Sequence, residues 1–508
     1  MPALSRSEAE VIEEGAAWLE NNESVLTDLL ESIVARPSMS GDEGRHNDSS
    51  TTVGYLWNFL ENHTDDVDLE YQAIRDSSQE DVSRDNVYSV LEGTGEAALI
   101  GLSHTDIVPP GAHSAWPDDD PFSVSHGTAT RIDRRTIEVE VAGETHERRI
   151  RDNLATVWDQ RGIDEIEVMI GRGVYDNKVC SVCLVGCLLG LQAALTSKDA
   201  ALGGDLIHAH LVDEEVEQLG VKAMSGWKDH DSWLADRYDS FEDFAAVILE
   251  GQYGFVPVVG HRGGINLTIN AYGEAVHGST PSLGRNAVLG TAKGLARMDK
   301  PEFYDAVTEL FIEDELLGEF TVAPGTTIAG GGIEDIDGSE GTVVRGGGAE
   351  YAVSDWCETT VDCRIPRWKG YPDGADDAHD RFLELVAEQL ATAAPEIDFS
   401  VDSNMFFLPV AMGEDETAAA NHPLVETAKQ ATNNMNGYTP EIAVAPGATD
   451  AWVLYHSTRI PTLVEYGPAG ALSHEPLEFV EQNQILQGAK TLLDMTVRQL
   501  GVDPDGMS

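Results

Sequence analysis

The chain has 508 residues, of which 89 are Asp or Glu and 32 are Lys or Arg, so its formal net charge is −57. This charge argues against binding to nucleic acid or to an anionic membrane surface, because both would repel the protein. A hydrophobic content of 42% is enough for a large core and argues against disorder, and the length predicts two or three domains.

The basic residues are unevenly divided into 9 Lys and 23 Arg. A surface this acidic repels itself at low ionic strength, whereas concentrated salt screens the repulsion. We therefore expect a halophilic protein, adapted to molar salt. The alternative is an ordinary acidic enzyme of the cytosol.

The N-terminus has no basic segment followed by an apolar run, and no stretch approaches a membrane-spanning length of about 18 apolar residues. We therefore expect a soluble, cytoplasmic protein. Three of the five cysteines, Cys180, Cys183 and Cys187, share one face of an apolar helical segment. An iron–sulfur cluster would need a fourth ligand nearby, so we interpret these cysteines as small buried residues.

In chain order, residues 8–36 and 50–63 have helical apolar spacing, and short apolar runs then alternate with polar or glycine-rich turns and helices. This alternation predicts an α/β domain with a mostly parallel sheet. The predicted strands lie at 97–102, 166–170, 205–212, 245–249, 442–444 and 462–466.

Two segments differ from this pattern. Residues 122–163 contain seven Arg and seven acidic residues, and a hairpin is predicted around Gly143. The segment is either an ion-paired surface hairpin or a rim that attracts an anionic substrate. Residues 260–367 alternate in the manner of an antiparallel sheet with helices on one side, which predicts an inserted α+β domain. The catalytic domain would then comprise residues 1–259 and 368–508.

Chemically active side chains follow five of the predicted strands, and ligands bind at the carboxyl ends of strands in parallel sheets. The set contains nitrogen and oxygen donors without a thiolate, which favours zinc, with cobalt or manganese as alternatives. Its members are His104, Asp106, Asp176, Glu214, Glu215, Glu250 and His474.

Several motifs occur in an order that resembles the M20 family of metallopeptidases and deacylases. They are SHTDIVPPG, GRGVYDNK, VDEEVEQLG, AVHGSTPSLGRNAV, PGATDA and GALSHEP. The family includes glutamate carboxypeptidase, aminoacylase-1, acetylornithine deacetylase and succinyl-diaminopimelate desuccinylase. The resemblance implies a zinc-hydrolase catalytic domain with an inserted lid and dimerisation domain, and hence a homodimer.

The resemblance also implies roles for the acidic and histidine side chains. His104 and Glu250 would bind one Zn²⁺, Glu215 and His474 the other, and Asp176 would bridge both. Asp106 would orient His104. Glu214 would be the general base that activates the water shared by the metals. A cis peptide bond is expected at Asp176–Asn177.

The substrate contacts implied by the resemblance are His277 and Arg364 in the inserted domain, and Gly447 and Thr449 in the PGATDA loop. His277 could instead be a surface histidine in a turn, and Arg364 could form a structural ion pair with Asp362. The separation of 72 residues between His104 and Asp176 is longer than usual in the family, and the arginine-rich hairpin accounts for the excess.

The predicted reaction is hydrolysis of an amide bond in an N-acyl amino acid or small peptide with a free carboxylate. The alternatives are a carboxypeptidase or dipeptidase of the same family, and a catalytically silent metal-binding scaffold. The expected partners are a small-molecule or short-peptide substrate, without nucleic acid or membrane. The sequence leaves open which acyl group or amino acid is accepted.

Overall fold

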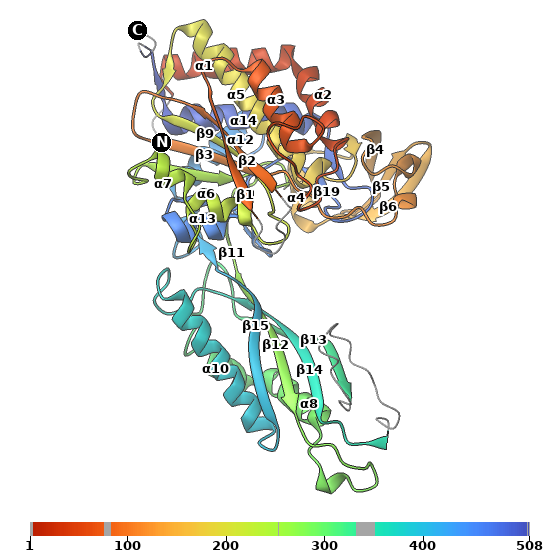
Figure 1. Cartoon of the computed structure of the whole chain (residues 1–508). Coiled ribbons are helices and arrows are strands. Elements are labelled where there is room, and N and C mark those ends of the chain that lie inside the picture. Colours follow the sequence, from red (N-terminus) through yellow and green to blue (C-terminus); the bar gives the residue numbers. More distant parts are fainter. Residues whose placement is uncertain (1–3, 76–82, 252, 332–350, 505, 507–508) are drawn as a thin grey trace. The chain divides into compact units, whose positions relative to one another are not determined.

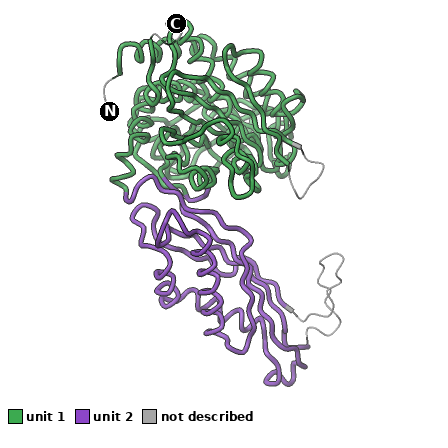
Figure 2. The backbone as a smooth tube through the Cα atoms, turned by 60° about the vertical axis from the view of Figure 1, so that its left-hand side comes forward, with its two compact units in different colours: residues 1–259, 416–445, 449–508 green, residues 260–415, 446–448 purple. Residues whose placement is uncertain are grey.

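The computed structural model describes residues 4–75, 83–251, 253–331, 351–504 and 506. The chain forms two compact units, coloured separately in Figure 2. The first comprises residues 1–259, 416–445 and 449–508, and the second comprises residues 260–415 and 446–448.

The first unit contains a six-stranded sheet whose central strands are parallel. Strands β1, β2, β3 and β9 of this sheet are labelled in Figure 1. Strand β3 is apolar from Ala98 to Leu102 and buried along its whole length, as expected for a strand covered on both faces. β3 pairs in parallel with β9 and β10, while β1 and β2 are antiparallel. In sheet order the strands are β1 (Asp68–Arg75), β2 (Ser83–Leu91), β9 (Asp205–Leu211), β3 (Ala98–His104), β10 (Phe244–Ile248) and β18 (Thr462–Leu463).

A second six-stranded sheet in this unit is antiparallel through β4, β5, β6, β7, β19 and β20. The prediction that strand 166–170 joins the parallel sheet is wrong, because β7 pairs with β4 of the arginine-rich segment and with β20. The predicted hairpin around Gly143 is confirmed by the pairing of β5 with β6. In sheet order the strands are β19 (Gly470–Ala471), β20 (Phe479–Glu481), β7 (Glu165–Ile170), β4 (Ser125–Arg131), β5 (Thr136–Val141) and β6 (Glu144–Arg149).

Helix α5 (Val179–Lys198) is the central helix of the first unit and packs against α1 and α14. All three of its cysteines are buried and free. The helical segment Val174–Lys198 is long and apolar enough to span a membrane, but 83% of its apolar window is buried inside the fold. The expectation that no stretch approaches that length is therefore wrong, since core helices can be equally apolar.

The remaining elements of the first unit surround these sheets. The predicted helix 8–36 is divided at Asn22 into α1 and α2. The helices are α1 (Arg6–Asn21), α2 (Glu23–Val34), α3 (Thr52–His63), α4 (Asp152–Arg161), α6 (Leu219–Ser225), α7 (Trp233–Arg237), α11 (Glu416–Ala420), α12 (Pro423–Asn436), α13 (Ala451–Thr458) and α14 (Asn483–Leu500). The short helices and strands are η1 (His113–Ala115), η2 (Pro117–Asp119), η3 (Val174–Lys178), β8 (Ala201–Leu202), β17 (Ala443–Ala445) and β21 (Val502–Asp503).

The second unit is a four-stranded antiparallel sheet with helices against it. Along β14 buried residues alternate with half-buried ones, the pattern of a sheet covered on one face. The unit continues to Asp415, beyond the predicted boundary at 367, because β15 pairs with β12 and α10 packs on α8 and β15. Its sheet order is β13 (Thr321–Gly331), β14 (Trp356–Ile365), β12 (Gly263–Tyr272) and β15 (Asp398–Phe407). Its other elements are α8 (Ala287–Met298), α9 (Pro301–Val307), α10 (Ala375–Ala393), η4 (Pro281–Leu283) and β16 (Val410–Ala411), and β11 (Val258–His261) spans the boundary in sequence.

Candidate metal centre and active site

Three parallel strands bring candidate ligands to one edge of the central sheet. β3 ends at His104, β9 ends at Leu211 shortly before Glu214, and β10 ends at Ile248 shortly before Glu250. Because these strands are parallel neighbours, their carboxyl ends lie together. The central sheet therefore supplies one histidine and carboxylates to the site.

Asp176 comes from the turn between β7 and α5. The peptide bond between Asp176 and Asn177 is cis, as predicted. The buried carboxylate of Glu478 accepts hydrogen bonds from the backbone amides of Tyr175 (3.0 Å) and Asp176 (2.9 Å). Its other oxygen is paired with buried Arg172. Glu478 thus fixes the backbone that carries Asp176.

The two oxygens of Asp176 face different histidines. Oδ1 lies 3.3 Å from Nε2 of His104, and Oδ2 lies 3.3 Å from Nε2 of His474. His104 Nε2 is also 3.5 Å from Glu250 Oε2, while His474 Nε2 is 3.1 Å from Glu215 Oε1. The five side chains therefore form two sets of three that share Asp176.

These separations fit pairs of ligands around metal ions. Two donors each 2.0–2.2 Å from a tetrahedral Zn²⁺ lie roughly 3.3–3.6 Å apart. The four distances between nitrogen and oxygen in the site span 3.1 to 3.5 Å, most of them longer than a good hydrogen bond. Ligand atoms of His104, Asp176 and Glu215 also lie within 4.8 Å of one another. The donor set and its geometry therefore fit a pair of divalent cations.

The field at the site also favours cations. Hydrogen bonds with the carboxylates of Asp176 and Glu215 raise the pKa of His474 to about 10. Burial raises the pKa of Glu250 to about 7, and the carboxylates of Asp176 and Glu215 add to that effect. Carboxylates this close repel one another unless a positive charge separates them, so a bound cation would stabilise the cluster.

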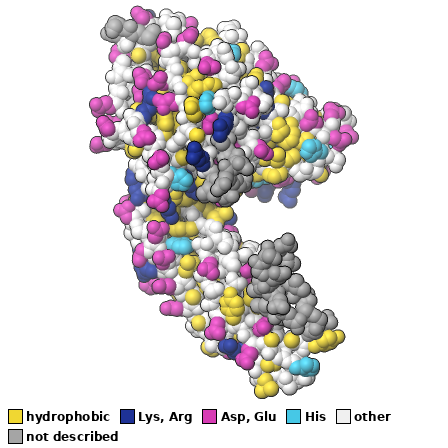
Figure 3. All heavy atoms as spheres, viewed as in Figure 1, with side chains coloured by type: hydrophobic (Ala, Val, Ile, Leu, Met, Phe, Trp, Pro, Cys, Tyr) yellow, Lys and Arg dark blue, Asp and Glu magenta, His cyan; other side chains and the backbone are white. Residues whose placement is uncertain are grey.

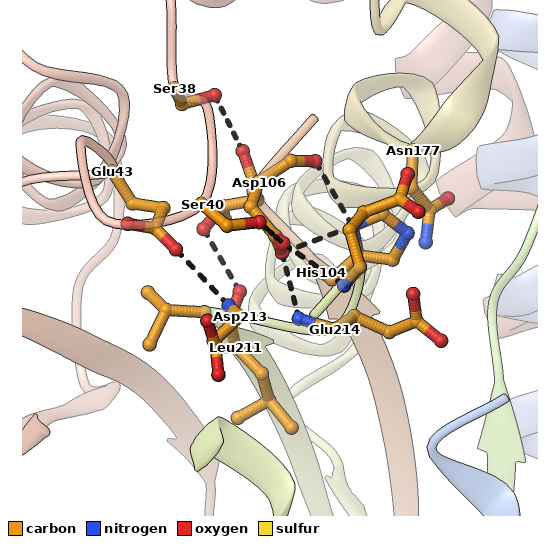
Figure 4. A network of polar contacts seen from close by, with 12 residues as sticks. Ser38, Ser40, Glu43, His104, Asp106, Asn177, Leu211, Asp213 and Glu214 are labelled. Carbon is orange, nitrogen blue, oxygen red and sulfur yellow. Dashed lines mark hydrogen bonds and ion pairs between the residues drawn. The ribbon is translucent and has the colours of Figure 1, made fainter. Parts of the chain in front are cut away.

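Asp106 connects His104 to the segment that carries Glu214 (Figure 4). Its Oδ1 lies 3.3 Å from His104 Nδ1 and accepts a 3.0 Å hydrogen bond from the Glu214 amide. Its Oδ2 accepts bonds from the Glu215 amide (3.1 Å) and the Ser40 hydroxyl (2.6 Å). Burial opposes ionisation of Asp106, but the bonds from His104 and Ser40 hold its pKa below the ordinary value.

The Glu214 side chain extends away from its amide, which Asp106 holds (Figure 4). Burial, together with the carboxylates of Glu250 and Asp450, raises the pKa of Glu214 well above its ordinary value, although His104 opposes the shift. A carboxylate with a raised pKa is a better proton acceptor at neutral pH. The arrangement is therefore suited to accept a proton beside two cation sites.

Comparison with known proteins bears on this arrangement. The model of the peptidase family M20/M25/M40 matches residues 153–498, more than half of the chain. The chain belongs to this family. It is accordingly a hydrolase, and metallopeptidases of the M20 family use metal ions.

The curated relatives of this M20 chain are distant. A probable carboxypeptidase of Arthroderma otae is 24% identical over 54% of this chain and 48% of its own length. A succinyl-diaminopimelate desuccinylase of Rickettsia felis is 23% identical over 47% of this chain and 50% of its own length. The matches thus span about half the length of these two relatives. A probable carboxypeptidase of Paracoccidioides lutzii is 21% identical over 78% of this chain and 71% of its own length.

Solved structures share the fold. The dipeptidase Dug1p of Saccharomyces cerevisiae has a TM-score of 0.57 at 13% identity, covering 98% of this chain and 99% of that one. A Bacillus subtilis protein described as a dinuclear metal binding peptidase from the M20 family has a TM-score of 0.53 at 11% identity, covering 94% and 98%. At these identities the likeness shows the fold alone.

The predicted metal ligands all belong to the first unit, and the predicted substrate residues are divided between the two units. His277, Arg364 and Gly447 belong to the second unit, whereas Thr449 belongs to the first. The Thr449 hydroxyl donates to the Val464 carbonyl (3.0 Å) and accepts from the Ala451 amide (3.3 Å), so its bonds hold its own loop.

Within the second unit, His277 Nδ1 contacts the Ser279 hydroxyl at 2.7 Å. Arg364 forms the ion pair with Asp362 that the sequence offered as an alternative, at 3.0 Å. The role of His277, Arg364, Gly447 and Thr449 in substrate binding stays a prediction.

Sequence reasoning missed the residues that hold the ligands in place. Glu478 and Arg172 fix the Asp176 turn, and Ser40 contacts Asp106. The one signal for Glu478 is a charged residue beside the apolar run of β20, four residues after His474. Ser40 has no comparable signal, because it is far from its partner in sequence.

Proposed function

We propose that this chain is a dinuclear amidohydrolase that cleaves an amide bond in an N-acyl amino acid or short peptide with a free carboxylate. The single observation that carries the proposal is the bridging position of Asp176, with one oxygen toward His104 and the other toward His474. A silent scaffold would not need Glu214 beside this cluster.

His104, Glu250 and Asp176 would hold one ion, and Glu215, His474 and Asp176 the other. Zn²⁺ is our first choice, and Co²⁺ or Mn²⁺ suits the same donors. When bound, such ions acidify water and stabilise negative charge on a carbonyl oxygen. Asp106 holds the His104 ring by its Nδ1 side, which leaves Nε2 free to bind metal.

Glu214 moves the proton in this reaction. It accepts a proton from the attacking water while the water oxygen bonds to the amide carbon. It then donates that proton to the nitrogen as the bond between carbon and nitrogen breaks, so the products are a carboxylic acid and an amine. The bonds from the Glu214 and Glu215 amides to Asp106 keep this base in position.

Two substrate classes compete within this chemistry. The desuccinylase among the relatives supports an acyl amino acid, and the carboxypeptidases support a peptide. We place the deacylase first and the carboxypeptidase or dipeptidase second. The two use the same cluster and differ in the pocket beside it.

The test is a turnover screen of N-acetyl and N-succinyl amino acids and of dipeptides, in molar KCl with added Zn²⁺ or Co²⁺. We expect hydrolysis of acyl amino acids by the wild type and none by Glu214→Gln, which should bind the same amount of metal. Hydrolysis of dipeptides alone would favour the second class. Activity retained in Glu214→Gln would show that another group is the base.

A further inference from the structure

Three arginines of the arginine-rich segment 122–163 form ion pairs with aspartates of the same segment. Arg131 pairs with Asp159 at 2.8 Å, Arg134 with Asp152 at 3.1 Å, and Arg135 with Asp152 at 3.4 Å. These three form the ion-paired surface that the sequence offered as one interpretation. Their guanidinium groups are therefore already paired with carboxylates of the protein.

Arg149 and Arg151 differ from that group. Both are exposed, and neither forms an ion pair with a carboxylate anywhere in the part of the chain that the structure describes. Arg151 Nη1 donates a hydrogen bond to the Tyr253 hydroxyl at 3.4 Å. The carboxylates of Asp133 and Glu465 interact with Arg149 and Arg151, respectively, from beyond ion-pair distance. In a protein with a net charge of −57, two such neighbouring guanidinium groups are unusual.

The two arginines line the same pocket, which has a volume of about 60 Å³. One water molecule needs about 10–15 Å³ by this measure, so a carboxylate group has enough room. Glu475 also lines the pocket, and the charged lining is therefore two arginines against one carboxylate.

The pocket is lined by residues that are adjacent in sequence to predicted metal ligands. Three of its lining residues are such direct neighbours, so the pocket borders the backbone segments that carry these ligands. Tyr175 precedes Asp176, Gly251 follows Glu250, and Ser473 precedes His474.

Packing holds the two arginines in place. They flank Ile150, which is only 3% exposed and belongs to the same core cluster as Tyr253 and Leu472. Tyr253 and Leu472 also line the pocket. The backbone that carries both guanidinium groups is thus anchored to the wall of the pocket, which lowers the entropy lost when they bind an anion.

We propose that Arg149 and Arg151 form a subsite for a carboxylate of the substrate, beside the metal centre. The proposal rests on the proposed function and adds a specificity determinant to it. Guanidinium groups bind carboxylates through paired charge-assisted hydrogen bonds, and contacts at this range persist in concentrated salt better than long-range attraction does.

The experiment compares wild type, Arg149→Gln/Arg151→Gln and the control Arg148→Gln, all loaded with Zn²⁺ in 2 M KCl. Arg148 neighbours Arg149 on β6 but is not among the residues that line the pocket, and its Nη1 donates to the Glu147 carbonyl at 2.9 Å. The control therefore removes similar charge from the same strand.

Three substrate pairs identify which carboxylate is bound. N-succinylalanine against N-acetylalanine tests the acyl group, N-acetylglutamate against N-acetylglutamine tests the side chain, and N-acetylalanine against N-acetylalaninamide tests the α-carboxylate. We expect the double variant to lose about 10- to 100-fold in kcat/KM for the charged member of one pair, with its neutral partner and the control little changed. Equal losses for both members of every pair, or no loss, would overturn the subsite.

A binding measurement separates this proposal from the proposed function. Succinate should raise the Tm of the zinc-loaded wild type more than succinamide does, and the double variant should lose that difference. If the wild type hydrolyses none of the substrates, but shows the difference in Tm between succinate and succinamide and the double variant loses it, the proposed reaction is wrong and the subsite stands. If it hydrolyses the substrates and Arg149→Gln/Arg151→Gln changes neither selectivity nor succinate binding, the subsite is wrong and the reaction stands.

Discussion

At the scale of single residues, Asp106 has a positioning role that is distinct from metal binding and from proton transfer. It contacts the ring of His104 and receives the amides of Glu214 and Glu215, so one buried carboxylate sets the position of a ligand and of the proposed base. Its four partners use both of its oxygens, which leaves no freedom for the side chain to turn.

Replacing Asp106 by Asn should therefore lower both metal affinity and kcat. An amide cannot accept on both sides, and one of the two backbone amides or the Ser40 hydroxyl would lose its partner. We expect a loss of about 10- to 100-fold in zinc affinity, measured by competition with a chelator. The exposed Asp119→Asn is the matched control, and equal zinc affinity of Asp106→Asn and wild type would contradict the positioning role.

At the scale of elements, β9 contains two buried histidines whose titration should affect stability. Burial lowers the pKa of both His208 and His210 to about 3. Among the described residues, His208 Nδ1 and His210 Nε2 have no hydrogen-bond partner. Both rings are therefore held neutral in the folded protein.

These histidines should make the protein sensitive to acid. These histidines bind protons near pH 6.5 in the unfolded chain and near pH 3 in the folded chain. Their contribution to the free energy of unfolding is therefore fully present above pH 6.5 and is lost as the pH falls from 6.5 to 3. Within this pH range the free energy of unfolding falls by up to ~1.4 kcal/mol per pH unit for each histidine. His208→Met should shift the midpoint of acid unfolding, followed by circular dichroism, to lower pH. An unchanged midpoint, with the exposed His63→Met as control, would show that His208 does not contribute.

The sequence predicted elements well where local pattern determines them. The apolar run of β3 and the turn at Gly143 are both encoded by nearby residues, and the strand-end ligands follow from the parallel arrangement. Pairings between distant segments were not accessible in the same way. Strand β7 joins the second sheet because of β4 and β20, and β15 extends the second unit because it pairs with β12.

The same limit applies to the site. His104, Asp176 and His474 could be identified through motifs, and the structure brings them together. Glu478 and Ser40 act through contacts with residues 302 and 66 positions away, which no local pattern reports. The arginines at 149 and 151 were visible as part of a basic segment, but only packing separates them from the ion-paired ones.

At the scale of the whole molecule, acidic side chains outnumber basic ones over the visible surface (Figure 3). Because charges on such a surface repel one another, salt should stabilise the fold by shortening the screening length to about 3 Å at 1 M. We expect Tm to rise by roughly 10 °C between 0.1 and 2 M KCl. Sucrose at the same osmolality is the control, and an equal rise in sucrose would point to solvent exclusion instead of screening.

The second unit exposes apolar side chains that suit association with another copy. Leu283 is 71% exposed, Leu289 55% and Ile328 59%. We propose a homodimer through this unit, and we expect twice the chain mass by light scattering in 2 M KCl. Leu289→Asp should reduce the mass to that of a monomer, whereas Ile132→Asp in the first unit should not. A monomeric wild type would contradict the proposal.

The proposed reaction depends most on two metal positions that share Asp176. The direct measurement is the zinc content of the dialysed chain by mass spectrometry, together with hydrolysis, for the wild type, His474→Ala and the exposed control His63→Ala. We predict two zinc ions per chain in the wild type and the control, and one zinc ion with little activity in His474→Ala. One zinc ion per wild-type chain, or two that remain after His474 is removed, would contradict it.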